Sequence, residues 1–93
     1  MEELFEELAR KKDFFREMYT RIVLKDWENV VGEKMARHVL PKKVELGVLY
    51  LSYDDPLFAN EVRMRGEEII RILNERLKGI SKIDRIKFVR RGG

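Results

Sequence analysis

The side chains that could carry out covalent chemistry are few and widely separated. The chain has no cysteine, one histidine (His38) and, apart from its tyrosines, three hydroxyl residues, which are Thr20, Ser52 and Ser81. Nucleophilic catalysis needs a nucleophile, a base and an orienting group within reach of one another, and no spacing here supplies such a set. A phosphate-binding glycine loop followed by Lys-Ser or Lys-Thr is also missing from the sequence. We therefore expect a binding protein and not an enzyme.

The candidate metal ligands have simpler structural explanations. Zinc sites need several His or Cys ligands, and His38 stands alone. Asp54 and Asp55 could bind a hard cation. However, an aspartate before Pro56 is also typical of a helix start, where its carboxylate accepts free N–H groups of the first turn. The sequence thus predicts no metal and no cofactor.

Basic residues gather toward the C-terminus and indicate a different kind of chemistry. The net charge is +3, but residues 1–33 carry −3 and residues 34–93 carry +6. The last eighteen residues contain seven Lys and Arg side chains against a single Asp. Such a cluster favours a polyanionic or acidic partner, although a charged, soluble surface would have the same composition.

An aromatic ring would lie among these cations if two of the segments form strands. If Leu49, Leu51, Ile86 and Phe88 face the core, the residues that alternate with them along the strands face water. Val48 is a further candidate for this exposed sheet face. Rings and cations on a sheet hold single-stranded nucleic acid in several modules, because bases stack on the ring and cations hold phosphates. The alternative is a one-sided sheet that merely displays polar residues. The candidate nucleic-acid-binding residues are Lys43, Tyr50, Arg85, Lys87, Arg90 and Arg91.

The elements that must position these residues can be predicted from periodicity. Apolar residues at steps of three and four predict an amphipathic helical region from Leu4 to Val31, with Asp13 as a possible second start and Gly32 as a stop. This stripe comprises Leu4, Phe5, Leu8, Phe15, Met18, Tyr19, Ile22, Val23, Trp27, Val30 and Val31.

Period-two alternation on both sides of Gly47 predicts an antiparallel hairpin, with Pro41 at a strand start or a sheet edge. A second helix is predicted from Asp55-Pro56 to about Lys78, ended by Gly79. Gly66 inside that helix suggests that another backbone, that of the first helix, approaches closely. The last strand is expected from Ile83 to Val89, with Arg90 and Arg91 just beyond it.

These elements define an α+β protein in the order α-β-β-α-β. Two layers are expected, with the helices on one face of a three-stranded sheet and the other face open to water. The length fits a single domain over residues 1–93. The absence of cysteine, of an apolar span and of a basic leader predicts a cytoplasmic protein. Abundant Lys, Arg and Glu without any Gln suggest a thermophilic source.

Five blocks of the sequence together resemble a known family. Residues 27–32 (WENVVG) are similar to its W-x-x-V-V-G signature, and residues 35–38 with Pro41 continue it. Residues 47–51 (GVLYL), 55–62 (DPLFANEV), 73–79 (LNERLKG) and 83–88 match its later blocks. The family is DciA, the bacterial replicative-helicase loader or operator.

The resemblance covers about residues 15–89 and implies a KH-like domain without ATPase activity. It implies single-stranded DNA and a DnaB-type helicase as partners. Phe58 stands where the family usually has Trp, Val39 replaces a small hydroxyl residue, and the KH hallmark G-x-x-G is absent. Two other hypotheses stay open, namely a KH-like RNA-binding module, and a homodimeric or protein-interaction domain that uses a strand edge or the acidic N-terminal helix.

Overall fold

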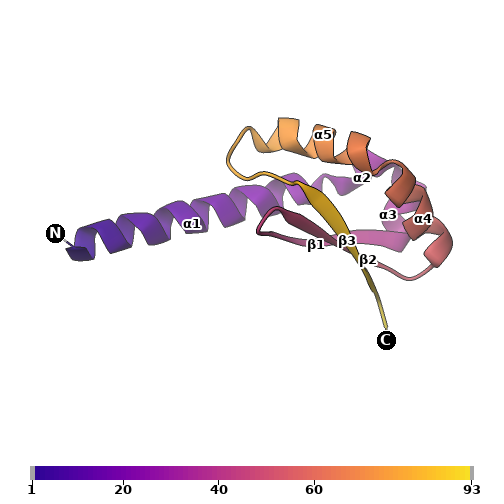
Figure 1. Ribbon diagram of the computed structural model, residues 1–93, viewed down its shortest axis with the longest axis horizontal. Coiled ribbons are helices and arrows are strands. Elements are labelled where there is room, and N and C mark those ends of the chain that lie inside the picture. The colour runs from indigo at the N-terminus through magenta and orange to yellow at the C-terminus, as the bar shows by residue number, and fades with distance from the viewer. Residues whose placement is uncertain (1, 93) are drawn as a thin grey trace.

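A computed structural model describes residues 2–92 as a layer of helices packed on a three-stranded sheet (Figure 1). This arrangement confirms the predicted α+β class and the order of helical and strand regions. The elements follow the chain as α1 (Glu2–Lys25), α2 (Trp27–Val31), α3 (Glu33–His38), β1 (Val39–Glu45), β2 (Val48–Tyr53), α4 (Pro56–Met64), α5 (Gly66–Leu77) and β3 (Arg85–Arg90).

The sheet has the strand order β1-β2-β3. The hairpin partners β1 and β2 are antiparallel, whereas β3 returns beside β2 in the parallel direction. Pro41 lies in the edge strand β1, next to an irregularity in the register between Pro41 and Lys43. An edge position suits proline because it has no N–H to donate to a second neighbour. The hairpin turn contains Leu46 and Gly47, both at positive φ, which is the backbone that a tight two-residue turn requires.

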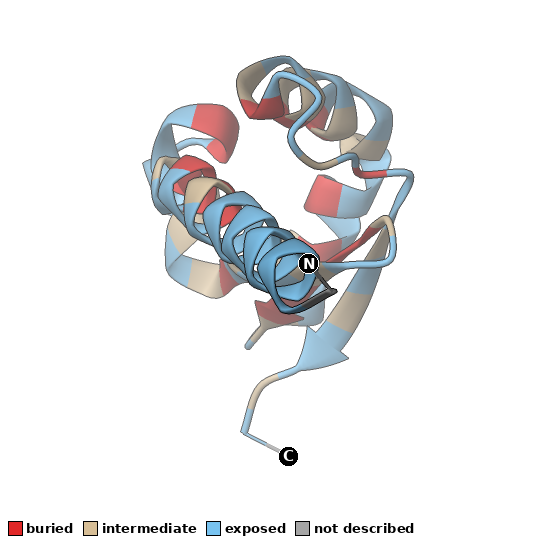
Figure 2. Ribbon diagram, turned by 90° about the vertical axis from the view of Figure 1, so that its left-hand side faces the viewer, coloured by how far each residue is buried: buried red, intermediate tan, exposed pale blue. Residues whose placement is uncertain are grey.

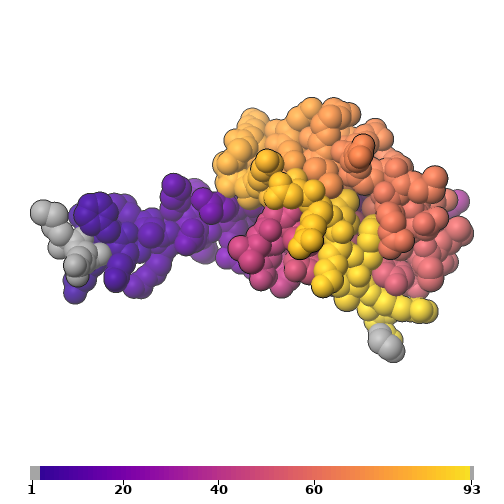
Figure 3. Space-filling model, in the orientation of Figure 1, coloured from indigo at the N-terminus to yellow at the C-terminus, as the bar shows by residue number. Residues whose placement is uncertain are grey.

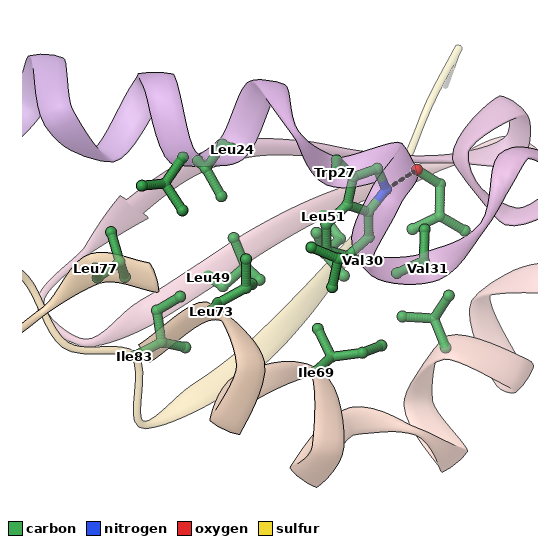
Figure 4. Close-up of a cluster of buried hydrophobic side chains, with 13 residues drawn as sticks. Leu24, Trp27, Val30, Val31, Leu49, Leu51, Ile69, Leu73, Leu77 and Ile83 are labelled. Carbon is green, nitrogen blue, oxygen red and sulfur yellow. Dashed lines mark hydrogen bonds between the residues drawn. The ribbon is translucent and has the colours of Figure 1, made fainter. Parts of the chain in front are cut away.

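The core lies between the helices and the inner face of the sheet. Figure 4 shows side chains from α1, α2, α5 and the sheet meeting there, with Leu49, Leu51, Ile69 and Leu73 fully buried. Ile83, just before β3, closes one end of the core. The expectation of a helical layer on one sheet face is therefore confirmed.

The first helix differs from the expectation in where its apolar residues lie. It continues through Asp13 and is broken only at Asp26, before α2. Only its last turns reach the core, through buried Val23 and Leu24, while the first turns project from the body of the molecule (Figures 1 and 2). The expected single core stripe is thus wrong for six of its residues, which are exposed: Leu4, Phe5, Leu8, Phe15, Met18 and Ile22.

The second predicted helix is interrupted at Arg65 and forms α4 and α5. A Cβ at Gly66 would meet only the side chain of Ile86, at 3.8 Å. The proposed close approach of another backbone to Gly66 is therefore wrong. Gly66 begins α5 at the bend between α4 and α5. At this bend the Arg65 guanidinium donates a hydrogen bond to the Val31 carbonyl at the end of α2. At the other end the C-cap is Lys78 in the left-handed conformation, one residue before Gly79.

Two of the family-like signature residues have structural roles. The Trp27 indole is buried and donates a hydrogen bond of 2.7 Å to the Val39 carbonyl (Figure 4). The Asn74 amide binds the backbone of Ile83 twice, donating to its carbonyl at 2.9 Å and accepting from its N–H at 2.8 Å. Asn74 thereby ties the segment before β3 to α5, and fixes where the last strand begins.

Candidate nucleic-acid interface

A row of three residues crosses the middle of the outer sheet face. Tyr50 in β2 lies opposite Lys43 in β1 and opposite Lys87 in β3. The ammonium of Lys43 lies 5.0 Å from the centre of the Tyr50 ring, and that of Lys87 lies 6.0 Å away. Both distances are within the range of cation–π attraction. The structure therefore brings together one aromatic ring and two lysines that are far apart in the sequence.

The neighbouring row places Arg85 beside Val48 and Glu45 on the same face. Arg85 is exposed, whereas Val48 is buried although its register places it on this face. Val48 is therefore not part of the accessible surface, and the expectation that it faces water is wrong. We call this surface the open face and define it by Lys43, Glu45, Tyr50, Arg85 and Lys87.

Glu45 modifies the charge of the open face. Its carboxylate accepts a hydrogen bond of 2.8 Å from the Lys43 ammonium. This hydrogen bond and the attraction of the carboxylate raise the pKa of Lys43 above its usual value. A raised lysine pKa favours the charged form, so Lys43 is a cation throughout the neutral range. The same carboxylate is the one acidic side chain of the open face and would repel a polyanion.

Arg90 and Arg91 do not join the open face. Arg90 is the last residue of β3, not a residue beyond it, and by strand alternation it projects opposite to Lys87. Arg91 follows the strand. Its backbone N–H donates to the Tyr53 carbonyl and its guanidinium to the His38 carbonyl, at 2.7 and 3.4 Å. The position expected for Arg90 is therefore wrong, and Arg91 is engaged with the body of the molecule.

A groove beside β3 contains a cation that sequence analysis missed. It lies between the α4–α5 bend and the free edge of β3, on the face shown in Figure 3, and both cations (Arg85 and Lys87) and acidic side chains (Glu67 and Asp84) line it as well. The Arg63 guanidinium lies 5.1 Å from the centre of the Phe88 ring there. Arg63 lies more than twenty residues from β3 in sequence, and only the parallel return of the chain brings them together.

His38, Asp54 and Asp55, which were singled out in the sequence, have partners within the fold. The His38 ring stacks on Phe58 at 4.0 Å and pairs with Asp54 at 3.0 Å, and Asp55 caps α4 by accepting from the Leu57 N–H. Only one of the two aspartates is thus the helix cap. Among the side chains that the structure describes, residues 3–92, no three of the His, Cys, Asp or Glu type lie where they could hold a metal ion. None of the helices described there is long and apolar enough to span a membrane.

The fold and this surface together define a small α+β protein whose one-sided sheet displays an aromatic ring between cations. The chain belongs to the DciA family, whose model, described as "Dna[CI] antecedent, DciA", matches residues 1–88. It is also similar to a protein of Mycolicibacterium paratuberculosis named "UPF0232 protein", with 31% identity over 67 residues. That match covers 72% of this chain and 37% of the relative, so the chain spans well under half of the relative's length.

Proposed function

We propose that the protein binds single-stranded DNA on the open face and acts with a DnaB-type replicative helicase as a loader or operator, without catalytic activity of its own. The observation that supports DNA binding is the row of Lys43, Tyr50 and Lys87. A base stacked on the tyrosine ring would place its flanking phosphates near the two ammonium groups. Arg85 extends the positive surface along β3 toward the groove.

Membership of the DciA family supports the helicase part of the proposal. Arg63 supplies a further positive charge in the groove beside the open face, where three cations (Arg63, Arg85 and Lys87) outnumber the two acidic side chains of the lining (Glu67 and Asp84), so a single strand could continue from one surface to the other. Arg90 and Arg91 have no assigned role in this proposal.

Titration with a labelled oligo-dT strand tests the DNA contact. The double variant Lys43→Ala/Lys87→Ala is compared with Lys25→Ala/Lys34→Ala, which removes two exposed lysines from α1 and α3 with the same change in net charge. We expect only the first variant to bind weakly. Its slope of log affinity against log salt should fall by about 0.7 for each phosphate that the variant no longer neutralises. Equal affinities for both variants would remove the open face from the proposal.

Two further measurements separate this function from its rivals. Competition between single-stranded DNA and RNA of one sequence should favour DNA, whereas a preference for RNA would support an RNA-binding module. A pull-down with the cognate replicative helicase at low salt, with and without single-stranded DNA, should recover a complex. Absence of association in both conditions would contradict the helicase role and leave the DNA-binding result standing.

A further inference from the structure

The exposed side of α1 carries a regular apolar stripe. It consists of six residues at alternating steps of four and three, which we call the distal stripe: Leu4, Leu8, Lys11, Phe15, Met18 and Ile22. This is the seven-residue repeat of a coiled-coil seam, with a lysine at one seam position. The apolar members are 45–73% exposed, although side chains of this kind are normally withdrawn from water.

The distal stripe cannot serve the core of its own domain. The residues of α1 that are buried there are Thr20, Val23 and Leu24. At 3.6 residues per turn, they lie on the other side of the helix, roughly 150° around its axis from the stripe. The first turns of α1 also extend beyond the rest of the molecule (Figures 1 and 3). A contiguous apolar surface of this kind indicates an interaction site.

We propose that the distal stripe pairs with the same stripe of a second copy, forming an antiparallel two-helix coiled coil about a two-fold axis. The spacing suits this pairing because one register aligns the whole seam. Leu4 of one copy then packs against Ile22 of the other, Leu8 against Met18, and Lys11 against Phe15. Each pair occurs twice, so a two-fold axis near residue 13 leaves no seam position unmatched.

Lys11 favours the antiparallel direction over the parallel one. A parallel pair would place Lys11 against Lys11 inside the seam, where like charges repel. The antiparallel pair places it against the Phe15 ring, to which an ammonium is attracted.

The charges that flank the seam do not decide the direction by themselves, because a parallel pair would place Glu7 beside Lys12, whereas the antiparallel pair places Lys12 beside Lys12 near the axis. The first seven residues of the chain contain four Glu, and Lys or Arg predominate from Arg10 to Lys25. Antiparallel pairing brings these oppositely charged parts together. It also places Glu7 of one copy beside Arg21 of the other, and Phe14 beside Phe14 at the axis. This dimer is independent of the proposed binding of DNA.

Sedimentation velocity of the full chain across a wide concentration range tests the proposal. We expect a reversible dimer that Phe15→Glu converts to a monomer with an unchanged circular dichroism spectrum. The control Leu57→Glu alters a similarly exposed apolar residue on α4 and should dimerise normally. A wild-type chain that stays monomeric at every concentration, or a dimer that survives Phe15→Glu, would overturn the proposal.

Charge reversal tests the direction. Glu7→Arg alone and Arg21→Glu alone should each weaken the dimer about tenfold, since each creates two like-charge contacts. The double variant Glu7→Arg/Arg21→Glu should restore wild-type affinity. In a parallel dimer the new arginine would instead lie beside Lys12 and the new glutamate beside Asp26. The double variant would then be weaker than either single one, and that result would overturn the antiparallel register.

Discussion

At the scale of single residues, Tyr50 gains its significance from its neighbours across the strands. Period-two alternation predicted that Lys43, Tyr50 and Lys87 share one sheet face, and the register places them in one row. The alternation could not show that Glu45 pairs with Lys43, because residues two apart on a strand contact one another only when their side-chain conformations allow it. Glu45 therefore offers a direct way to vary the charge of the open face.

Replacing Glu45 by Gln should strengthen DNA binding. The change removes the carboxylate that repels phosphates and lets the pKa of Lys43 return toward its usual value, which still leaves Lys43 charged at neutral pH. We expect the affinity for an oligo-dT strand to rise about two- to fivefold at low salt, the size of an exposed charge interaction. The gain should shrink as salt increases. Unchanged or weaker binding would argue that DNA does not approach Lys43.

Replacing Trp27 by Phe should destabilise the fold although an aromatic ring remains. The buried Val39 carbonyl would lose the hydrogen bond that it accepts from the indole, at a cost of about 1–3 kcal/mol in the free energy of unfolding. Urea denaturation measures this loss. A variant as stable as the wild type would show that the hydrogen bond contributes nothing net.

Replacing Gly47 by Ala should also be costly. Gly47 has a φ of +79°, and a Cβ there would overlap the Asp84 carboxylate. We expect a loss of about 1–3 kcal/mol. Comparing the same substitution in an Asp84→Ala background separates the two causes, because only the overlap should disappear. If the cost is identical in both backgrounds, the backbone conformation alone accounts for it.

At the scale of elements, α1 shows the limit of periodicity. Its apolar residues follow helical spacing along its whole length, so the sequence predicted a helix and a single core stripe. On the core side, Val23 and Leu24 follow Thr20 by three and four residues, and on the other side the distal stripe follows the same steps, so both sides of the helix satisfy the helical spacing. Periodicity identifies an apolar face but not the molecule against which that face packs.

Deletion of residues 1–14 should therefore leave the folded domain intact. Side chains 3–14 are exposed, and in the described part of the chain the first hydrogen bond from α1 to another element is the one that the Tyr19 hydroxyl donates to the Arg76 carbonyl. At concentrations where the full chain is monomeric, we expect the free energy of unfolding to change by less than about 1 kcal/mol. A larger loss in urea denaturation would mean that the first turns of α1 support the core.

The loop before β3 is an element whose placement depends on one side chain. The sequence motif around Leu73 and Asn74 matched the family pattern, but the pattern alone did not say why an asparagine stands there. The two hydrogen bonds between Asn74 and the Ile83 backbone supply the reason. The neighbouring helix end was predicted one residue late, since Lys78 adopts the left-handed conformation usually given to glycine.

At the scale of the whole molecule, the sequence predicted the class, the order of the regions and the antiparallel hairpin. The parallel pairing of β2 with β3 was not predicted, because it depends on the path that the chain takes across α4 and α5. The same path places Arg63 beside Phe88 and creates the groove next to the open face. Long-range proximity of this kind leaves no local pattern in the sequence. The sheet residues of the candidate interface were therefore predicted, whereas Arg63 was not.

The most direct test of DNA binding on the open face is an NMR titration of the labelled protein with a short oligo-dT strand. We expect the largest chemical-shift changes at Tyr50, Arg85 and Lys87 and in the part of β1 around Lys43, with smaller changes along the groove near Arg63. The shifts should diminish at high salt. Changes concentrated elsewhere, with the amides of β2 and β3 unaffected, would contradict the account.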